Sequence, residues 1–198
     1  MIKVTVQDIE KVNNAYDFLK SIYQVDDILN ITLPIKPEEI AKRIDKLNFK
    51  NNSSFRDFNK SGYVKVNRSN DSKFEDIDLW VNPSEHPNRQ RFTIAHEIGH
   101  LVFDVIPKLN EPTANEIFVD QFNRDGASNP SEVKANKFAA QLLMPLEHVK
   151  KSIKDLTAEM KNKGQKIAKS EVIELMANKF EVSTMAMEIR LKNLGYID

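Results

Sequence analysis

Apolar residues recur every three to four positions in several stretches of this chain, and this spacing predicts amphipathic helices. The stretches are residues 8–29, 91–103, 132–144, 171–180 and 184–194. Proline followed by two acids, Pro37-Glu38-Glu39, is typical of a first helical turn, so a further helix is expected from residue 37.

Residues 62–66 and 77–81 alternate between apolar and polar side chains, as half-buried strands do. With the helices, they predict an α+β fold that is mainly helical, with a small β-sheet packed on the helix over 91–103. Strand 77–81 leads toward that helix, and a free edge on it could hold an extended peptide by backbone hydrogen bonds. An ordinary interior strand, paired on both edges, is the alternative.

The helix over 91–103 contains the sequence His96-Glu97-Ile98-Gly99-His100, which fits the pattern H-E-x-x-H. Two histidines four residues apart lie on one helical face, so both imidazoles can reach one metal ion at about 2.0–2.1 Å. Glu97 would sit beside the ion and take a proton from a metal-activated water. The pattern therefore predicts a zinc peptidase.

The residues around the motif favour a metal site over a chance match. Phe92, Ala95, Gly99 and Phe103 continue the histidine stripe, so the two histidines are set into a buried helix face. Gly99 costs a helix about 1 kcal/mol relative to alanine, which makes sense if another element passes close to its backbone.

A catalytic zinc needs a third protein ligand and an open position for water, and Glu132 is the best candidate for that ligand. It begins the helix over 132–144, whose alanines allow a close approach to the histidine helix. Alternatively, Glu132 only complements the helix dipole, with Asn129 or Ser131 as the cap. Asn136, one turn later, is a candidate hydrogen-bond partner of a ligating imidazole, or a plain core amide.

Two longer motifs resemble the ImmA/IrrE family of zinc metallopeptidases. They are Arg89-Gln90-Arg91-Phe92-Thr93-Ile94-Ala95-His96-Glu97-Ile98-Gly99-His100 and Glu132-x-x-Ala135-Asn136-x-Phe138-Ala139-Ala140-x-Leu142-Leu143-Met144-Pro145. The resemblance covers roughly residues 33–194, and the two motifs together are far more specific than either alone. The chain departs from the family pattern in an N-terminal extension and a long insert between the motifs.

The resemblance implies a zincin-like fold with His96, His100 and Glu132 as zinc ligands and Glu97 as the catalytic glutamate. It also implies a partner, because family members are typically encoded beside a helix-turn-helix repressor that some of them cleave, and others belong to toxin–antitoxin pairs. We therefore expect a zinc-dependent endopeptidase that cleaves a helix-turn-helix repressor or antitoxin-like protein. The alternative is a zinc-stabilised, non-catalytic protein that sequesters such a partner.

Composition fits a small cytoplasmic enzyme. At 198 residues the chain can bury one substantial core. It has no cysteine, which excludes disulfides and thiolate zinc ligands, and its first residues lack the apolar stretch of a signal peptide. Twenty-nine basic and twenty-nine acidic residues cancel, so no overall field favours nucleic acid, and the longest apolar runs are too short to cross a membrane.

We expect three parts along the chain: an N-terminal helical extension over 1–32, a zincin-like core over 33–150 and a C-terminal helical segment over 151–198 packed on the core. The insert over 104–130 separates the metal helices and contains the apolar run Ile117-Phe118-Val119. This insert is either a lid or substrate-selecting loop, or a solvated excursion that carries one short strand.

The C-terminal segment predicts a helix-turn-helix-like pair, with Ser183 as the cap of the second helix. A DNA-binding regulator would share this arrangement. The second helix nevertheless begins with residues unsuited to reading base edges: Thr184, Met185, Met187 and Glu188. No direct nucleic-acid binding is expected. The lysine-rich stretch over 150–169 is interpreted as a solvated face, with a patch for an acidic partner as the alternative.

A second group that stabilises the oxyanion is expected beside the metal. Tyr63, Arg91 and His148 are the polar candidates, and the sequence does not discriminate among them. His86 precedes the histidine helix and is expected to be a surface residue.

Overall fold

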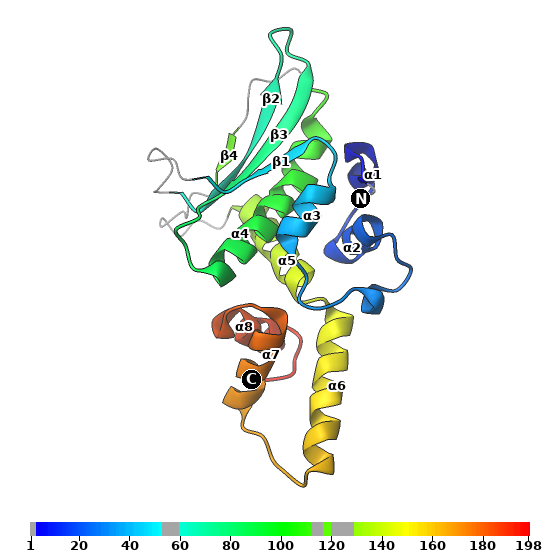
Figure 1. Cartoon of the computed structure of the whole chain (residues 1–198), viewed down its shortest axis with the longest axis vertical. Helices are drawn as coiled ribbons and strands as arrows, with labels where there is room; N and C mark the ends of the chain where they lie inside the picture. The colour runs from blue at the N-terminus through cyan, green and yellow to red at the C-terminus, as the bar shows by residue number, and fades with distance from the viewer. Residues whose placement is uncertain (1–2, 53–59, 112–116, 120–128) are drawn as a thin grey trace.

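The computed structural model of the chain describes residues 3–52, 60–111, 117–119 and 129–198. The helices are α1 (Val6–Glu10), α2 (Ala15–Tyr23), α3 (Pro37–Arg43), α4 (Pro87–His100), α5 (Pro130–Leu143), α6 (Leu146–Asn162), α7 (Lys169–Phe180) and α8 (Thr184–Asn193). Short helical turns are η1 (Ile28–Asn30), η2 (Leu101–Val105) and η3 (Ile106–Lys108), and the strands are β1 (Leu47–Lys50), β2 (Gly62–Arg68), β3 (Phe74–Val81) and β4 (Ile117–Val119). The predicted α+β class, with helices and a small sheet, is confirmed (Figure 1).

The described strands form one sheet in the order β1-β3-β2-β4. β1 runs parallel to β3, whereas β2 pairs antiparallel with both β3 and β4. Ile77 has Leu47 as its partner on one side and Val66 on the other, so the stretch predicted as a strand is the interior of the sheet. The hypothesis that residues 77–81 offer a free edge to a peptide is therefore wrong.

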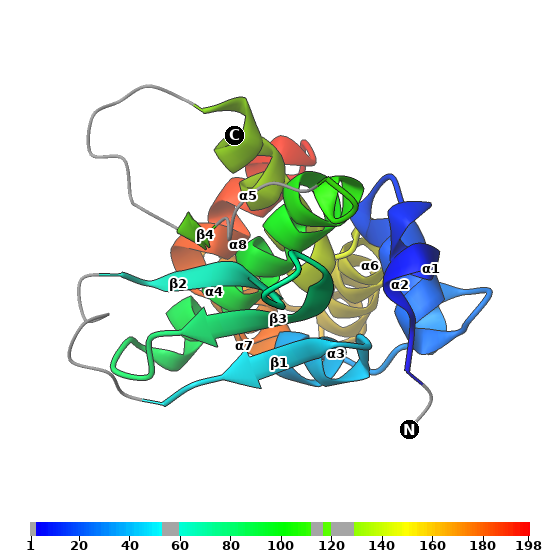
Figure 2. The same ribbon diagram turned by 90° about the horizontal axis from the view of Figure 1, so that it is seen from above.

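Helix α4 lies between the sheet and α5 (Figure 2). Successive side chains of β2 and β3 point to opposite faces of the sheet, so one face can be apolar and pack on a helix. Val64, Val66, Ile77 and Leu79 are all buried. The predicted packing of the sheet on the histidine helix is confirmed by contacts of α4 with both strands. The helix that carries both histidines is thus held on two sides.

The backbones of α4 and α5 approach each other closely at Gly99. A β-carbon built on Gly99 would lie 3.1 Å from Ala135 Cα and 3.3 Å from the Ala135 carbonyl oxygen. Small residues on both helices permit this approach, as the alanines of α5 and Gly99 predicted. Below the contact, Phe138 makes edge-to-face contacts with Phe18 of α2 and Phe103, with ring centroids 5.4 Å apart in each pair.

The single helix predicted over 8–29 is wrong, because the chain is broken there into α1, α2 and η1. Asn14 starts α2 by accepting a hydrogen bond from the Asp17 backbone N–H at 3.0 Å. A side chain that caps a new helix competes with continuation of the previous one. Ile9 and Ile22, part of the predicted apolar face, are nevertheless buried.

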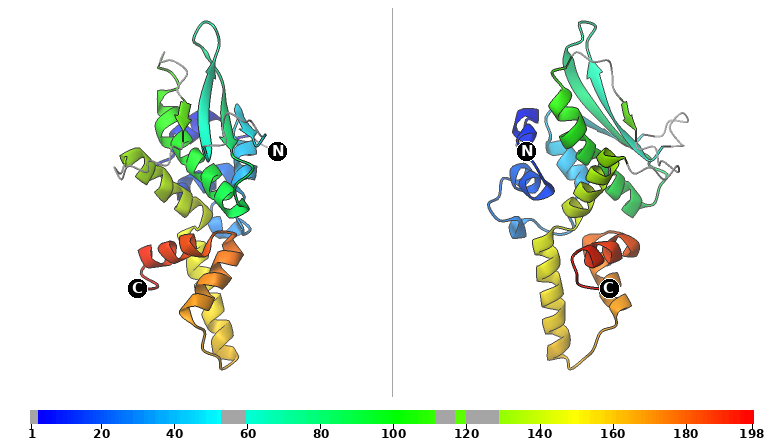
Figure 3. Two further views of the ribbon diagram at one scale, coloured as in Figure 1. Left: turned by 90° about the vertical axis from the view of Figure 1, so that its left-hand side faces the viewer. Right: turned by 180° about the vertical axis from the view of Figure 1, so that it is seen from behind.

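Helices α6, α7 and α8 lie at the end of the molecule opposite the sheet (Figures 1 and 3). Glu181 adopts a left-handed conformation in the turn between α7 and α8, and Ser183 caps α8 as predicted, accepting from the Ala186 backbone N–H at 3.1 Å. The lysines of the stretch over 150–169 are exposed. Among the helices that the structure describes, none combines the length and apolar composition needed to span a bilayer.

Within the insert over 104–130, residues 117–119 form β4, which pairs with β2. The prediction of one short strand there is confirmed. Residues 112–116 and 120–128 lie outside the described residues, so the lid or substrate-selecting role remains a prediction.

Candidate metal centre

His96, His100 and Glu132 present their ligand atoms to one another at the junction of α4 and α5. The two histidine Nε2 atoms are 2.9 Å apart, and the Glu132 carboxylate lies 3.3 Å from His96 Nε2 and 3.2 Å from His100 Nε2. Both histidines are buried, and Glu132 is partly exposed. Asn129 caps α5, accepting from the Ser131 backbone N–H at 3.0 Å, so the cap and the inward-facing Glu132 coexist.

Hydrogen bonds to the other ring nitrogen orient each histidine. His96 Nδ1 lies 3.0 Å from Asn136 Oδ1, and His100 Nδ1 lies 2.8 Å from Asp104 Oδ2. An amide or carboxylate oxygen accepts, so each ring carries its proton on Nδ1 and leaves the Nε2 lone pair directed at Glu132. This is the arrangement by which ligating imidazoles are usually held.

Asp104 was missed in the sequence, although it stands four residues after His100. Its carboxylate also accepts a hydrogen bond from Ser131 Oγ at 2.6 Å, so it links the end of the histidine helix to the first turn of α5. The α-helix changes to a π-helical turn at η2, and Asp104 lies in that turn. The i, i+4 spacing from a metal-site histidine was the available signal.

The donor set fits a zinc ion. Four donors arranged tetrahedrally about 2.0–2.1 Å from zinc are about 3.3–3.4 Å from each other, close to the distances observed here. Two imidazole lone pairs and a carboxylate that face one another repel unless a cation lies between them. Burial and the neighbouring His100 ring lower the pKa of His96 below its ordinary value, which favours the neutral form that binds metals.

Glu97 directly follows His96 in α4 and is fully buried, and β2 leaves room for its carboxylate at Gly62. A β-carbon built on Gly62 would lie 2.6 Å from Thr93 Cγ2, 3.0 Å from the Trp80 carbonyl oxygen and 3.2 Å from Glu97 Oε1. Gly62 is therefore part of the site, although no sequence signal beyond its place at the start of a strand pointed to it.

The three candidates for a second oxyanion group lie elsewhere. Arg91 donates to the carbonyl oxygens of Ile35 and Glu181 at 2.7 and 3.1 Å, and His148 donates to the carbonyl of Ile31 at 2.9 Å. Both side chains therefore satisfy backbone groups between segments.

Tyr63 stacks on Trp80, with ring centroids 5.3 Å apart. It follows Gly62 in β2, so its side chain is on the sheet face opposite α4. His86 is the N-cap of α4, accepting from the Asn88 backbone N–H at 3.2 Å.

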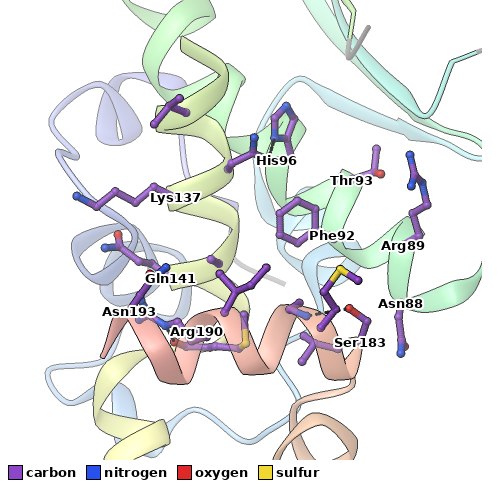
Figure 4. Close-up of a pocket in the computed structure, with 18 of the residues that line it drawn as sticks. Asn88, Arg89, Phe92, Thr93, His96, Lys137, Gln141, Ser183, Arg190 and Asn193 are labelled. Atoms are coloured by element: carbon purple, nitrogen blue, oxygen red, sulfur yellow. Dashed lines mark hydrogen bonds between the residues drawn. The ribbon is translucent and has the colours of Figure 1, made fainter. Parts of the chain in front are cut away.

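A groove of about 1340 Å³ runs from the metal centre along α4 and α5 to α8 (Figure 4). His96 and Glu132 line it beside the metal centre, and α8 contributes Met185 and Arg190. The groove gives the ligands access to a bound molecule much larger than water.

We expect Gly62→Ala to lower the free energy of unfolding by about 1–3 kcal/mol, because the new methyl overlaps the Thr93 side chain. Thr93→Ser removes Cγ2, the atom closest to the new methyl. The double variant should therefore be more stable than the sum of the two single changes in the free energy of unfolding predicts. Urea unfolding of the four proteins measures this coupling. Simple additivity would contradict the contact, and Lys65→Ala on the same strand is the control.

Asp104→Ala should raise the dissociation constant for zinc about 10–100-fold, because the His100 ring loses the acceptor that fixes it. Competition with a chromophoric chelator measures the change. Asp155→Ala, which removes a carboxylate exposed on α6, is the matched control. Equal affinities of Asp104→Ala and wild type would show that this carboxylate does not support the site.

Comparison with protein families gives independent evidence about the chain. Residues 52–192 match the model of the IrrE N-terminal-like domain of peptidase family M78, which covers most of the chain and includes α4 and α5. No curated protein sequence matches it significantly. The family's peptidases are generally metal-dependent, in agreement with a cluster in which three ligand atoms lie within 4.8 Å of one another. The chain belongs to the family of peptidases with an IrrE N-terminal-like domain.

Proposed function

We propose that the protein is a zinc-dependent endopeptidase, with His96, His100 and Glu132 as zinc ligands and Glu97 as the catalytic residue. The observation that carries the proposal is the convergence of two Nε2 atoms and one carboxylate, with the fully buried Glu97 next to His96 in the same helix. Family membership supports peptidase activity, and the ligand set supports zinc.

A zinc ion held there would lower the pKa of a water molecule and polarise the scissile carbonyl. Glu97 then accepts the proton of the attacking water and delivers it to the departing amine. The fully buried position of Glu97 suits this role, because proton transfer and charge stabilisation are more effective away from bulk water. Asn136 and Asp104 hold the imidazole rings in place through their Nδ1 protons.

The substrate that we propose is a helix-turn-helix repressor or antitoxin-like partner, whose cleavage changes gene expression. The resemblance of both helix motifs to ImmA/IrrE peptidases supports this partner. The groove beside the metal centre is long enough to accept a peptide segment of a protein. A zinc-stabilised protein that only sequesters its partner would have no use for the buried Glu97 beside the ligands, so hydrolysis is favoured.

Two substitutions separate metal binding from chemistry. Glu97→Gln should keep the zinc affinity within a few fold of wild type and reduce kcat by at least about 100-fold, because the amide cannot accept the proton. Glu132→Ala should weaken zinc itself, because it removes one of three ligands. Metal content after dialysis and chelator competition measure both effects. Wild-type zinc affinity in Glu132→Ala would rule out Glu132 as the third ligand.

The activity is tested by incubating the zinc-loaded protein with the helix-turn-helix protein encoded beside it. We expect fragments, detected by mass spectrometry, that are absent with Glu97→Gln. Glu188→Gln, an exposed carboxylate on α8, is the control that should cleave normally. Repeating the reaction with manganese identifies the working metal.

An intact partner bound stoichiometrically by both the wild type and Glu97→Gln would instead support sequestration. A partner that is neither bound nor cleaved would overturn the proposal for the substrate.

A further inference from the structure

The end of the groove far from the metal centre holds a buried cation. Arg190 on α8 is only 8% exposed, and its Nε donates to the carbonyl oxygen of Met144 at 3.0 Å. Within the described residues, its guanidinium forms no ion pair with a carboxylate. Burial lowers the pKa of Arg190, and the negative charge of Glu147 raises it by less. A largely buried cation with no carboxylate in ion-pair range is unfavourable, so the anionic group of a ligand would be attracted to it.

The lining of the groove selects the class of ligand. Val133, Met185 and Ile189 line it and are 54%, 71% and 54% exposed, an unusual amount of apolar surface in one place. Of the described carboxylates, only Glu132 lines it, at the metal end. Three cations, Arg89, Lys137 and Arg190, also line it, and Arg89 is already paired with Glu85 at 3.0 Å. This combination fits a peptide with apolar side chains and a carboxylate better than a nucleic acid, whose backbone needs a continuous basic track.

The length of α5 gives the distance between the metal centre and the Arg190 end of the groove. The groove follows this helix from Glu132 to Met144, and a rise of about 1.5 Å per residue makes that about 18 Å. An extended peptide covers the same distance in about five residues. Figure 4 shows His96 between α4 and α5, with Arg190 and Asn193 at the other end on α8.

We propose that Arg190 is a specificity-determining residue, which binds a carboxylate of the substrate about five residues from the scissile bond while the apolar wall of the groove takes the intervening side chains. This inference rests on the proposed function for its scissile bond, but binding tests it without hydrolysis. The carboxylate belongs either to an Asp or Glu side chain or to the substrate's C-terminus.

The probes are fluorescein-labelled peptides of alternating Leu and Ala that carry one Glu, placed near either end, and matched peptides with Gln instead. Each is made with a free and an amidated C-terminus, which separates the two sources of the carboxylate. Fluorescence anisotropy is measured with the full-length, zinc-loaded Glu97→Gln protein, so that no probe is consumed. All other substitutions are made in this background.

A peptide that presents a carboxylate should bind about tenfold more tightly than the matched peptide without one, as expected for a hydrogen bond to a charged group. Arg190→Gln should abolish this preference, and Arg190→Lys should retain part of it. Lys192→Gln, on the same helix and outside the groove, should leave it unchanged. Asn193→Asp places a carboxylate one turn from Arg190 and should reduce the preference without removing the cation.

Equal binding of all four kinds of peptide, with Glu or Gln and with a free or an amidated C-terminus, would overturn the inference, as would a preference that survives both Arg190→Gln and Asn193→Asp. Competition by a random-sequence DNA duplex as strong as that by the Glu peptide would reassign the groove to nucleic acid. These results are independent of the proposed function. If the partner is cleaved but no carboxylate preference is found, the proposed peptidase activity stands and the role of Arg190 is wrong. If the preference is found without cleavage, the role of Arg190 stands and the proposed activity is wrong.

Discussion

The backbone contact between α4 and α5 at Gly99 and Ala135 is the constraint on which the site depends. Glu132 lies three residues before Ala135, and His100 directly follows Gly99, so the contact sets the separation of the carboxylate from the imidazoles. A side chain at position 99 would move the two helices apart by a few tenths of an ångström. Bonds to a metal ion held by these side chains would tolerate little more than that, which fits a residue of poor helical propensity at position 99.

Much of the fold was predictable because its elements are amphipathic. The spacing of apolar residues identified α4 and α5, and alternation identified β2 and β3, because each of these elements buries one face against the others. The proximity of three candidate ligands was predictable for a related reason, since residues four apart share one helical face and the alanines of a second helix let Glu132 come close. The structure brings His96, His100 and Glu132 together, and their role as ligands is the proposal made here.

The parts that sequence reasoning missed depend on contacts between distant segments or on competition at a few residues. Asn14 is an example of local competition, because this one side chain caps a new helix and so interrupts an apolar pattern that runs through it. Gly62 is an example of a contact between distant segments, because Thr93 and Glu97 of another element leave no space for a side chain there. Arg91 resembled a catalytic group by its chemistry alone, and its partners are backbone carbonyls and the Glu181 carboxylate, far away in the sequence.

The two walls of the groove come from separate stretches of the chain. One wall is built by α4 and α5, which also carry His96, His100 and Glu132, and the other by α8, which follows two further helices. Substitutions on α8 would therefore change one wall of the groove without altering His96, His100, Glu132 or Glu97. Such a division allows relatives to diverge in the proteins that they recognise while the chemistry stays constant, so that α8 is the place where a new preference can evolve at little cost to the old reaction.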